Sequence, residues 1–252
     1  MNKSVINAVV LAGGTEDLEG NVHGYKSLLA LNGRPMIDYV VEALKNTPDV
    51  GEIAVVGPVD ELSPYISDKV DYIISEGDSM MDNVIFGLRP FQNDDRVLFL
   101  SSDIPFITPD AISHFIKQSC LTDADFCYPI VERSVNEARF PGFKRTYVRL
   151  KEGAFTGGNI MYVKPSLVTN HKELIEDLIA MRKEPINMIE LFGAGLAIDL
   201  AIGRASIEAI EKRIEQMLNI KAKAIISPYP EISQDIDKND DIKAALRIFE
   251  GA

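Results

Sequence analysis

The 252-residue sequence has little cysteine, no long apolar run and no leader-like start. Cys120 and Cys127 are too few for a disulfide framework or a four-ligand zinc site, so we expect both to be buried as small apolar side chains. No apolar segment reaches the ~20 residues of a membrane span. The N-terminus shows neither the apolar region nor the cleavage site of a signal peptide. These absences predict a cytoplasmic protein with no membrane partner.

Positive charge is scarce too, because 26 Lys and Arg stand against 38 Asp and Glu, a net charge of −12. A general nucleic-acid binder needs a basic face, so nucleic acid is not an expected partner. A single nucleotide needs only one or two cations and a metal ion. Histidine is also rare: His23, His114 and His171 are scattered and form no evident catalytic triad. Of the three, His23 is the best placed for a direct role.

The first half of the chain contains a regular alternation of strand-like and helix-like segments. Continuous apolar runs predict strands buried on both faces, and apolar residues at helical spacing predict the helices between them. The expected strands are Ile6–Leu11, Ile53–Val56, Val70–Ser75 and Val97–Ser101, and the expected helices run through Met36–Leu44 and Met80–Phe91 and begin at Thr108. This order favours an α/β fold with a mostly parallel sheet and helices on both faces.

The second half is less regular. The expected strands are Asp125–Pro129, Thr146–Lys151, Asn159–Val163 and Ala222–Ile226, and the expected helices are Pro165–Lys183, Ser206–Leu218 and Asp240–Phe249. The charged segment Arg133–Arg145 has no clear period and is interpreted as a loop or lid. No Gly-, Ser- or Pro-rich linker divides the chain. We therefore expect one domain over residues 1–252, with a nucleotide-binding half (1–120) and an acceptor-binding, metal-completing half (121–252).

A strand that ends in small residues opens the chain. Val9-Val10-Leu11-Ala12-Gly13-Gly14 is followed, after a loop, by Lys26 at the start of a new apolar segment. Small residues let the backbone approach a ligand, so that N–H groups can point at phosphates. A lysine just beyond adds a point charge for the same phosphates. The pattern predicts a nucleotide site.

Two acidic segments suggest metal binding. Leu98-Phe99-Leu100-Ser101-Ser102-Asp103 places an aspartate at the end of an apolar strand, where ligands of open α/β sheets bind. Asp103 suits Mg²⁺, which prefers oxygen ligands, but it could equally cap the turn before Pro105. In an extended segment, Asp235 and Asp237 would share one side, facing either one metal ion or solvent. Asp240 and Asp241 suit the N-terminus of the last helix.

Together these segments resemble the GT-A nucleotidyltransferases, in particular the MobA-like group that includes the molybdenum-cofactor guanylyl- and cytidylyltransferases. Members of that group open with a strand, LAGG or LAAG, a loop and a lysine, carry a strand-end aspartate, and close with a segment such as Asp-Ile-Asp-Thr-Pro-Glu-Asp-Leu. The matching residues here occur in the same order: Leu11-Ala12-Gly13-Gly14, Lys26, Leu31-Asn32-Gly33-Arg34-Pro35-Met36, Ser102-Asp103-Ile104-Pro105 and Asp235-Ile236-Asp237-Lys238-Asn239-Asp240-Asp241-Ile242.

The resemblance implies a three-layer α/β/α Rossmann-like GT-A fold and a role for each matched position. Lys26 and Asp103 would be the catalytic residues, and Asp103 and Asp237 would hold Mg²⁺. The nucleotide would be bound by Leu11, Ala12, Gly13, Gly14 and Lys26, and its base by Gly77 and Asn83. Gly157, Gly158 and Asn159 would face the acceptor, with Lys144, Arg145 and Arg149 as further candidates for its phosphate; a plain hairpin turn and a solvated basic face are the alternatives there.

The implied reaction is Mg²⁺-dependent transfer of a nucleoside monophosphate from an NTP, GTP or CTP, to a small phosphorylated acceptor with release of pyrophosphate. Such an acceptor is already ionised, so positioning and charge neutralisation suffice. A GT-A glycosyltransferase is disfavoured, because Ser101-Ser102-Asp103 stands where those enzymes usually carry Asp-x-Asp. A non-catalytic nucleotide-binding protein also stays open, as does assembly into a homo-oligomer.

The first loop, Thr15–Tyr25, departs from the family pattern. It contains three acids and lacks the arginine that members commonly place after the glycines. Acids near a triphosphate repel it unless a metal ion intervenes or they point away. The loop could therefore hold a second Mg²⁺, swing out, or weaken activity on the triphosphate.

Overall fold

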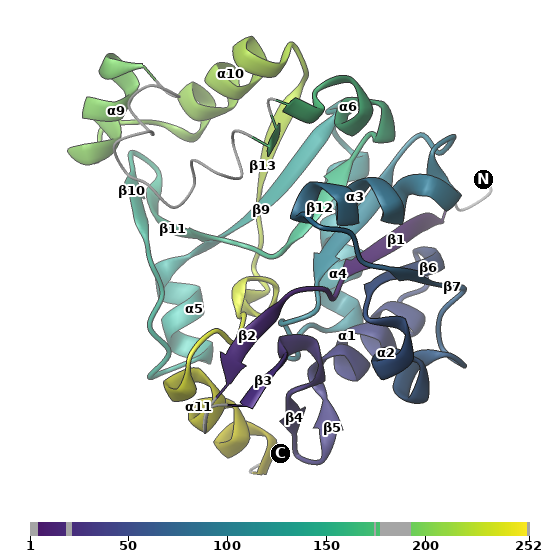
Figure 1. The fold of residues 1–252 in the computed structure, drawn as a ribbon. Helices are drawn as coiled ribbons and strands as arrows, with labels where there is room; N and C mark the ends of the chain where they lie inside the picture. The colour runs from purple at the N-terminus through teal and green to yellow at the C-terminus, as the bar shows by residue number, and fades with distance from the viewer. Residues whose placement is uncertain (1–4, 19–21, 174, 177–192, 251–252) are drawn as a thin grey trace.

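The centre of the computed structural model, which describes residues 5–18, 22–173, 175–176 and 193–250, is a nine-stranded mixed sheet (Figure 1). The strand order is β10-β11-β9-β12-β8-β1-β6-β7, with β13 paired to β9. The strands are β1 (Ile6–Leu11), β6 (Val50–Gly57), β7 (Tyr72–Ser75), β8 (Val97–Ser101), β9 (Phe126–Glu132), β10 (Val148–Leu150), β11 (Gly153–Gly157), β12 (Ile160–Val163) and β13 (Ala222–Ile226).

Residues 1–120 supply four adjacent parallel strands of this sheet. Strands β8, β1, β6 and β7 are parallel neighbours, and Val10 of β1 lies between Val55 and Leu100. These strands are apolar on both sides because helices cover both faces. Strand β12 joins β8 in antiparallel pairing and extends the sheet into the second half of the chain. The prediction of a mostly parallel, mixed sheet is confirmed.

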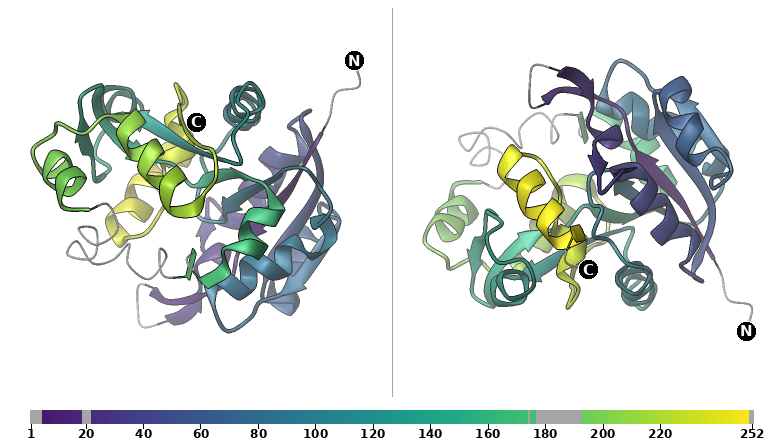
Figure 2. Two further views of the ribbon diagram at one scale, coloured as in Figure 1. Left: turned by 90° about the horizontal axis from the view of Figure 1, so that it is seen from above. Right: turned by 90° about the horizontal axis from the view of Figure 1, so that it is seen from below.

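Helices form a layer on each face of the sheet (Figures 1 and 2). One apolar cluster includes Val10 of β1 with Ile37 of α1 and Leu62 of α2, and a second includes Val9 of β1 with Met81 of α3. Alternate residues of one strand therefore face opposite layers, as the α/β/α prediction requires. The helices are α1 (Met36–Lys45), α2 (Val59–Ile66), α3 (Met80–Leu88), α4 (Pro109–Cys120), α5 (Arg133–Arg139), α6 (Pro165–Asn170), α9 (Ala194–Ala201), α10 (Ile207–Leu218) and α11 (Asn239–Glu250).

Hydroxyl side chains fix the starts of three helices. The Oγ atoms of Ser79 and Ser206 and the Oγ1 atom of Thr108 accept hydrogen bonds from the backbone N–H three residues later, at 3.0, 3.2 and 3.2 Å. Each bond satisfies a donor that the first helical turn leaves free. The predicted helix starts at Thr108 and Ser206 are confirmed. No helix in the described part of the chain is long and apolar enough to cross a bilayer.

The segment Arg133–Arg145, interpreted from its sequence as a loop or lid, begins instead with helix α5. Arg133 donates to Glu137 one turn later at 2.7 Å, a pairing that supports a short helix. Asn136 is buried and donates to the hydroxyl of Ser233 at 3.0 Å. That partner is 97 residues away in sequence, so the local pattern could not reveal the contact that anchors the helix.

The first loop forms a hairpin of β2 (Thr15–Leu18) and β3 (Val22–Tyr25), where the sequence predicted only a loop. Thr15 pairs with Tyr25 at its base. A short ribbon of β4 (Ala30–Leu31) and β5 (Arg34–Pro35) follows. The side chains of residues 16–23, which include the loop acids and His23, lie outside the described residues.

Three further expectations are corrected. The turn after β11 is not a hairpin, because β9 lies between β11 and β12. The helix predicted over Pro165–Lys183 is interrupted at His171: α6 ends at Asn170, residues 172–173 and 175–176 are helical again, and residues 174 and 177–183 lie outside the described residues. Cys127 is buried as predicted, but Cys120 is exposed because it is the last residue of α4, where the helix end meets solvent.

A separate aromatic cluster holds the C-terminal segment against the rest of the molecule. Phe106 and Phe140 lie 5.1 Å apart between ring centroids, and Phe106 stacks on Phe249 of α11 at the same distance. Ile236 is buried in this cluster. The carboxylates of Asp235 and Asp237, on either side of Ile236, converge with that of Asp103 instead. The cluster therefore sets the direction of both carboxylates.

Candidate active site

The predicted phosphate-binding residues lie where the parallel strands end. Leu11 pairs with Ser101 at the ends of β1 and β8, and its carbonyl oxygen accepts the Ser102 N–H at 3.1 Å. The Ala12 N–H donates to the Val56 carbonyl of β6 at 2.8 Å. The chain then leaves the sheet through Gly13 and Gly14, beside the ends of three strands. This is the edge at which open α/β sheets bind ligands.

Lys26 links two of the predicted metal ligands. Its Nζ donates to Asp103 Oδ2 at 2.7 Å and also to Asp237 Oδ1. The Lys26 and Asp103 side chains are only 14% and 18% exposed, whereas Asp237 is 51% exposed. Burial alone would lower the pKa of Lys26, but the charge of Asp103 and the hydrogen bonds to both carboxylates raise it well above its usual value. Lys26 therefore stays charged and occupies the gap between the two acids.

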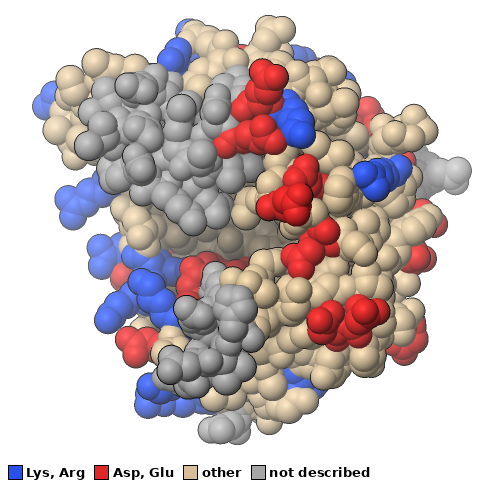
Figure 3. All heavy atoms as spheres, in the orientation of Figure 1, with Lys and Arg blue, Asp and Glu red and all other residues tan. Residues whose placement is uncertain are grey.

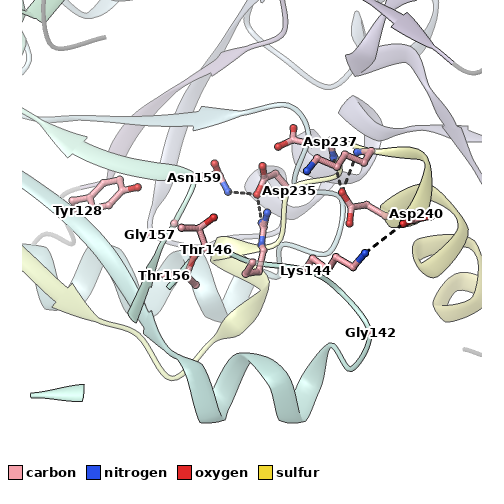
Figure 4. Close-up of a pocket in the computed structure, with 14 residues that line it drawn as sticks. Tyr128, Gly142, Lys144, Thr146, Thr156, Gly157, Asn159, Asp235, Asp237 and Asp240 are labelled. Atoms are coloured by element: carbon pink, nitrogen blue, oxygen red, sulfur yellow. Dashed lines mark hydrogen bonds and ion pairs between the residues drawn. The ribbon is translucent and has the colours of Figure 1, made fainter. Parts of the chain in front are cut away.

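Asp235 extends this group through a second cation. Arg145 donates to its carboxylate and to the Ser233 carbonyl, and the Asn159 side-chain amide donates to Asp235 Oδ1 at 3.2 Å (Figure 4). Burial raises the pKa of Asp235, and the neighbouring Asp237 raises it further, against the lowering effect of Arg145.

The pKa of Asp237 lies below its usual value. Burial acts to raise it, but hydrogen bonding with Asp235 and then with Lys26 lowers it by more.

Three carboxylates converge at this point. Within the described residues, one oxygen from each of Asp103, Asp235 and Asp237 lies within 4.8 Å of the others. Carboxylate oxygens are the ligands that Mg²⁺ prefers, and one or two of them with phosphate and water complete its usual shell. The donor set therefore fits a hard divalent cation, and Lys26 supplies the positive charge among the acids in this structure.

The predicted base-reading residues form a second group beside the glycines. Asn83 of α3 accepts the Gly77 N–H at 2.7 Å, and its amide nitrogen lies 3.0 Å from the point where a Cβ on Gly13 would be. The sequence analysis missed Glu76, which follows β7 and accepts the Gly14 N–H at 2.9 Å. The available signal was its place directly after a strand, the same signal that pointed to Asp103.

A cavity of about 440 Å³ opens beside the acidic group (Figure 4). Its lining includes the predicted acceptor residues Gly157, Gly158 and Asn159, together with Lys144 and Lys238. On the face drawn in Figure 3 a hollow lies between the upper and lower parts of the molecule, with basic side chains along its left margin over α5.

Close packing explains why Gly157 and Gly158 stand in the wall of this cavity. A Cβ on Gly157 would lie 2.3 Å from the Tyr128 hydroxyl oxygen, and one on Gly158 would lie 2.8 Å from Pro129. The absence of side chains therefore lets β11 and the following turn lie close to β9.

The remaining sequence candidates lie apart from this group. His114 on α4 packs its ring 5.3 Å from Tyr229, and burial, followed by Lys117, lowers its pKa. Arg149 belongs to β10 and is not among the residues that line the cavity. Asp241 accepts the backbone N–H groups of Asp237 and Lys238 at 3.3 and 3.0 Å, which makes it a capping residue of α11, as predicted.

Three similarities to known proteins agree with this geometry. Residues 8–188 match the family described as the MobA-like NTP transferase domain. A 2-C-methyl-D-erythritol 4-phosphate cytidylyltransferase of Clostridium novyi is 26% identical over 74% of this chain and 83% of that protein. A probable molybdenum cofactor guanylyltransferase of Natranaerobius thermophilus is 29% identical over 50% of this chain and 60% of that protein.

A solved structure extends the match into the C-terminal segment. The structure of a hypothetical transferase from Thermus thermophilus is 33% identical, covers 94% of this chain and 99% of that one, and has a TM-score of 0.84. With the family match over most of the chain, the strand-end site and the two transferase relatives, the chain belongs to the MobA-like NTP transferase family and is a nucleotidyltransferase.

Proposed function

We propose that this enzyme transfers a nucleoside monophosphate from an NTP to a small phosphorylated acceptor, with Mg²⁺ bound and pyrophosphate released. The single observation that carries the proposal is the contact of Lys26 with both Asp103 and Asp237 at the ends of β1 and β8. The ammonium group that would bind phosphates is thereby hydrogen-bonded to both carboxylates that would hold a metal ion.

The nucleotide would lie along Leu11, Ala12, Gly13 and Gly14, with its base near Gly77 and Asn83. Backbone N–H groups suit phosphate oxygens, and Lys26 would turn from the carboxylates to the triphosphate when a metal ion takes its place. The names of the relatives, a cytidylyltransferase and a guanylyltransferase, support CTP or GTP as the donor.

The acceptor would occupy the cavity beside Gly157, Gly158 and Asn159. Lys144 and Lys238 line its rim and provide positive charge for a phosphate. An oxygen of that phosphate attacks the α-phosphorus, the bond from this phosphorus to the bridging oxygen of the β-phosphate breaks, and pyrophosphate leaves with the electron pair. The attacking oxygen is already ionised, so no residue has to remove a proton.

Asp103 and Asp237 would hold Mg²⁺, with Asp235 beside them. When bound, the ion neutralises charge on the α-phosphate and orients it for in-line displacement. Lys26 would stabilise the negative charge that develops on the leaving pyrophosphate. Arg145 and Asn159 keep Asp235 in place and so preserve the geometry of the acidic group.

A pyrophosphate-release assay with each of the four NTPs, with and without Mg²⁺, and a panel of phosphorylated acceptors tests the proposal. We expect Mg²⁺-dependent release with GTP or CTP, and a loss of about 10²–10³-fold in kcat for Asp103→Asn, because a pre-organised charge partner is removed.

Asp110→Asn is the matched control, since Asp110 is an exposed acid of α4 that belongs neither to the acidic group nor to the lining of the cavity. It should leave turnover within about twofold of wild type. NTP binding that is indifferent to Mg²⁺, together with full activity of Asp103→Asn, contradicts the proposal. Release of a nucleoside diphosphate from nucleotide sugars, with no pyrophosphate released from any NTP, would indicate a glycosyltransferase instead.

A further inference from the structure

The carboxylate of Glu76 lies directly against the glycine loop that follows β1. Its Oε2 accepts the Gly14 N–H at 2.9 Å. A Cβ on Gly13 would lie only 2.3 Å from the same oxygen, so the carboxylate fills the space that the glycine leaves. A carboxylate of the protein itself therefore occupies the Gly14 N–H group and the open side of the loop.

Glu76 also lies beside Tyr25, the last residue of the neighbouring β2–β3 hairpin. Burial, and after it the nearby Glu76 carboxylate, raise the pKa of the Tyr25 phenol. Tyr25 pairs with Thr15 at the base of the β2–β3 hairpin, directly after Gly14. One carboxylate therefore lies close to the residues on both sides of that base.

Satisfying a buried donor cannot explain this contact. Gly14 is exposed and has a φ of +92°, so water can reach its N–H. Only a buried donor left without a partner destabilises a fold strongly. The position of Glu76 is therefore better explained by the anion-binding property of the loop than by a need of the fold.

A short distance along the chain, Lys26 is likewise paired with charged groups of the protein itself. Its ammonium group holds the carboxylates of Asp103 and Asp237. Both groups suited to phosphates, the Gly14 N–H and the Lys26 ammonium, thus hold internal carboxylates in this structure. Lys26 would be free for phosphates if a metal ion took its place between Asp103 and Asp237, whereas Glu76 forms no salt bridge within the described part of the chain.

We propose that Glu76 is an internal competitor for the nucleotide phosphates: its carboxylate holds the Gly14 N–H until a triphosphate displaces it. The inference rests on the proposed function, which places the triphosphate at Gly13 and Gly14. Two anions cannot share one donor group without repulsion, so displacement of Glu76 reduces the net affinity for every nucleotide. Glu76 thereby sets how tightly the site binds NTPs, irrespective of the base.

Calorimetric titration of the full chain with tripolyphosphate, and with each NTP, at one fixed Mg²⁺ concentration tests this. Glu76→Gln removes the charge but keeps an oxygen for the Gly14 N–H. We expect it to bind tripolyphosphate and all four NTPs about tenfold more tightly than wild type, which corresponds to about 1.4 kcal/mol. Tyr25→Phe, which removes the phenol hydroxyl beside the carboxylate, should shift the affinity in the same direction by a smaller factor.

Asp78→Asn is the matched control, because Asp78 is an exposed acid two residues further along the same loop and has no recorded contact with the glycines. It removes the same formal charge and should change each affinity by less than about twofold. Thermal unfolding of each variant verifies that the fold is intact.

Three results would overturn the inference. Unchanged or weaker binding by Glu76→Gln would show that the carboxylate is a structural clamp. A change confined to one NTP, with tripolyphosphate unaffected, would show that Glu76 reads the base. If wild type and variants are folded but none binds tripolyphosphate or any NTP, the placement of the phosphates fails, and the proposed function loses its support as well.

Discussion

Arg145 and Asp235 show what single residues contribute to this site. Their side chains are 12% and 18% exposed, and Arg145 also donates to the Ser233 carbonyl. Removal of the cation leaves a carboxylate in a buried setting that already raises its pKa. We expect Arg145→Ala to lower the free energy of unfolding at pH 7 by about 3 kcal/mol, measured by urea denaturation.

The pH dependence of that loss identifies its origin. The folded-state pKa of Asp235 is raised, so its ionised form destabilises the fold above that pKa, and the penalty disappears as the pH falls toward about 4 and the acid takes up a proton. The difference between Arg145→Ala and wild type should therefore shrink from pH 7 to about pH 4. Arg139→Ala is the control: its partner is Glu231, the Arg139 side chain is 56% exposed, and it should cost at most about 1 kcal/mol. A pH-independent loss for Arg145→Ala argues against this origin.

Two contacts of the site could not be predicted from the sequence, although Arg145 itself was a candidate for the acceptor phosphate. Glu76 meets Gly14 across 62 residues, and Arg145 meets Asp235 across 90. Neither residue stands in a spacing or local motif that predicts its partner. Lys26, Asp103 and Asp237 were accessible because each stands at the end of an apolar segment or within an ordered motif. Their chemical roles still await the assays described above.

At the scale of elements, the packing of α3 on the sheet depends on one glycine. A Cβ on Gly87 would lie 2.4 Å from Val9 Cγ1 of β1 and 3.0 Å from Val56 Cγ2 of β6. Gly87→Ala gains about 1 kcal/mol of helix propensity but introduces an overpacking cost of about 1–3 kcal/mol. We expect a net loss of about 1 kcal/mol in the free energy of unfolding.

Gly195→Ala provides the comparison, because among the described residues no atom outside its chain neighbours and its own helix backbone lies within 4 Å of the Cβ position of Gly195 in α9. There the propensity term stands alone and should stabilise the protein by about 0.5–1 kcal/mol. Urea denaturation of both variants shows whether each substitution raises or lowers the free energy of unfolding. Stabilisation by Gly87→Ala would mean that α3 can move away from the sheet without loss.

Strands and helices differed in how well the sequence predicted them. Strands β1 and β8 were evident because both faces are buried and the apolar run is continuous. Helix α5 and the β2–β3 hairpin were not, because their residues are polar and long-range contacts, such as the bond from Asn136 to Ser233, hold α5. Where local apolar periodicity is weak, tertiary partners decide the structure.

On the scale of the whole molecule, one sheet joins the two halves of the chain. Strand β12 pairs with β8 on one side and with β9 on the other, so the sheet continues without a break from residues 1–120 into the second half of the chain. We expect a single cooperative unfolding transition by calorimetry, and no stable fold for residues 1–120 alone, since Leu98 and Leu100 would then lie on an open edge. Two separate transitions, or a folded 1–120 fragment, would show two domains.

The distance in sequence between Lys26 and Asp237, 211 residues, has a consequence for synthesis of the protein. A ribosome releases β1 and β8 long before β12, which closes their sheet, and the segment with Asp235 and Asp237 emerges among the last. A partly made chain therefore carries the glycine loop and the lysine but lacks the acids that complete the group. We therefore expect chains that end before Asp235 to show no Mg²⁺-dependent pyrophosphate release, because two of the three converging carboxylates are then missing.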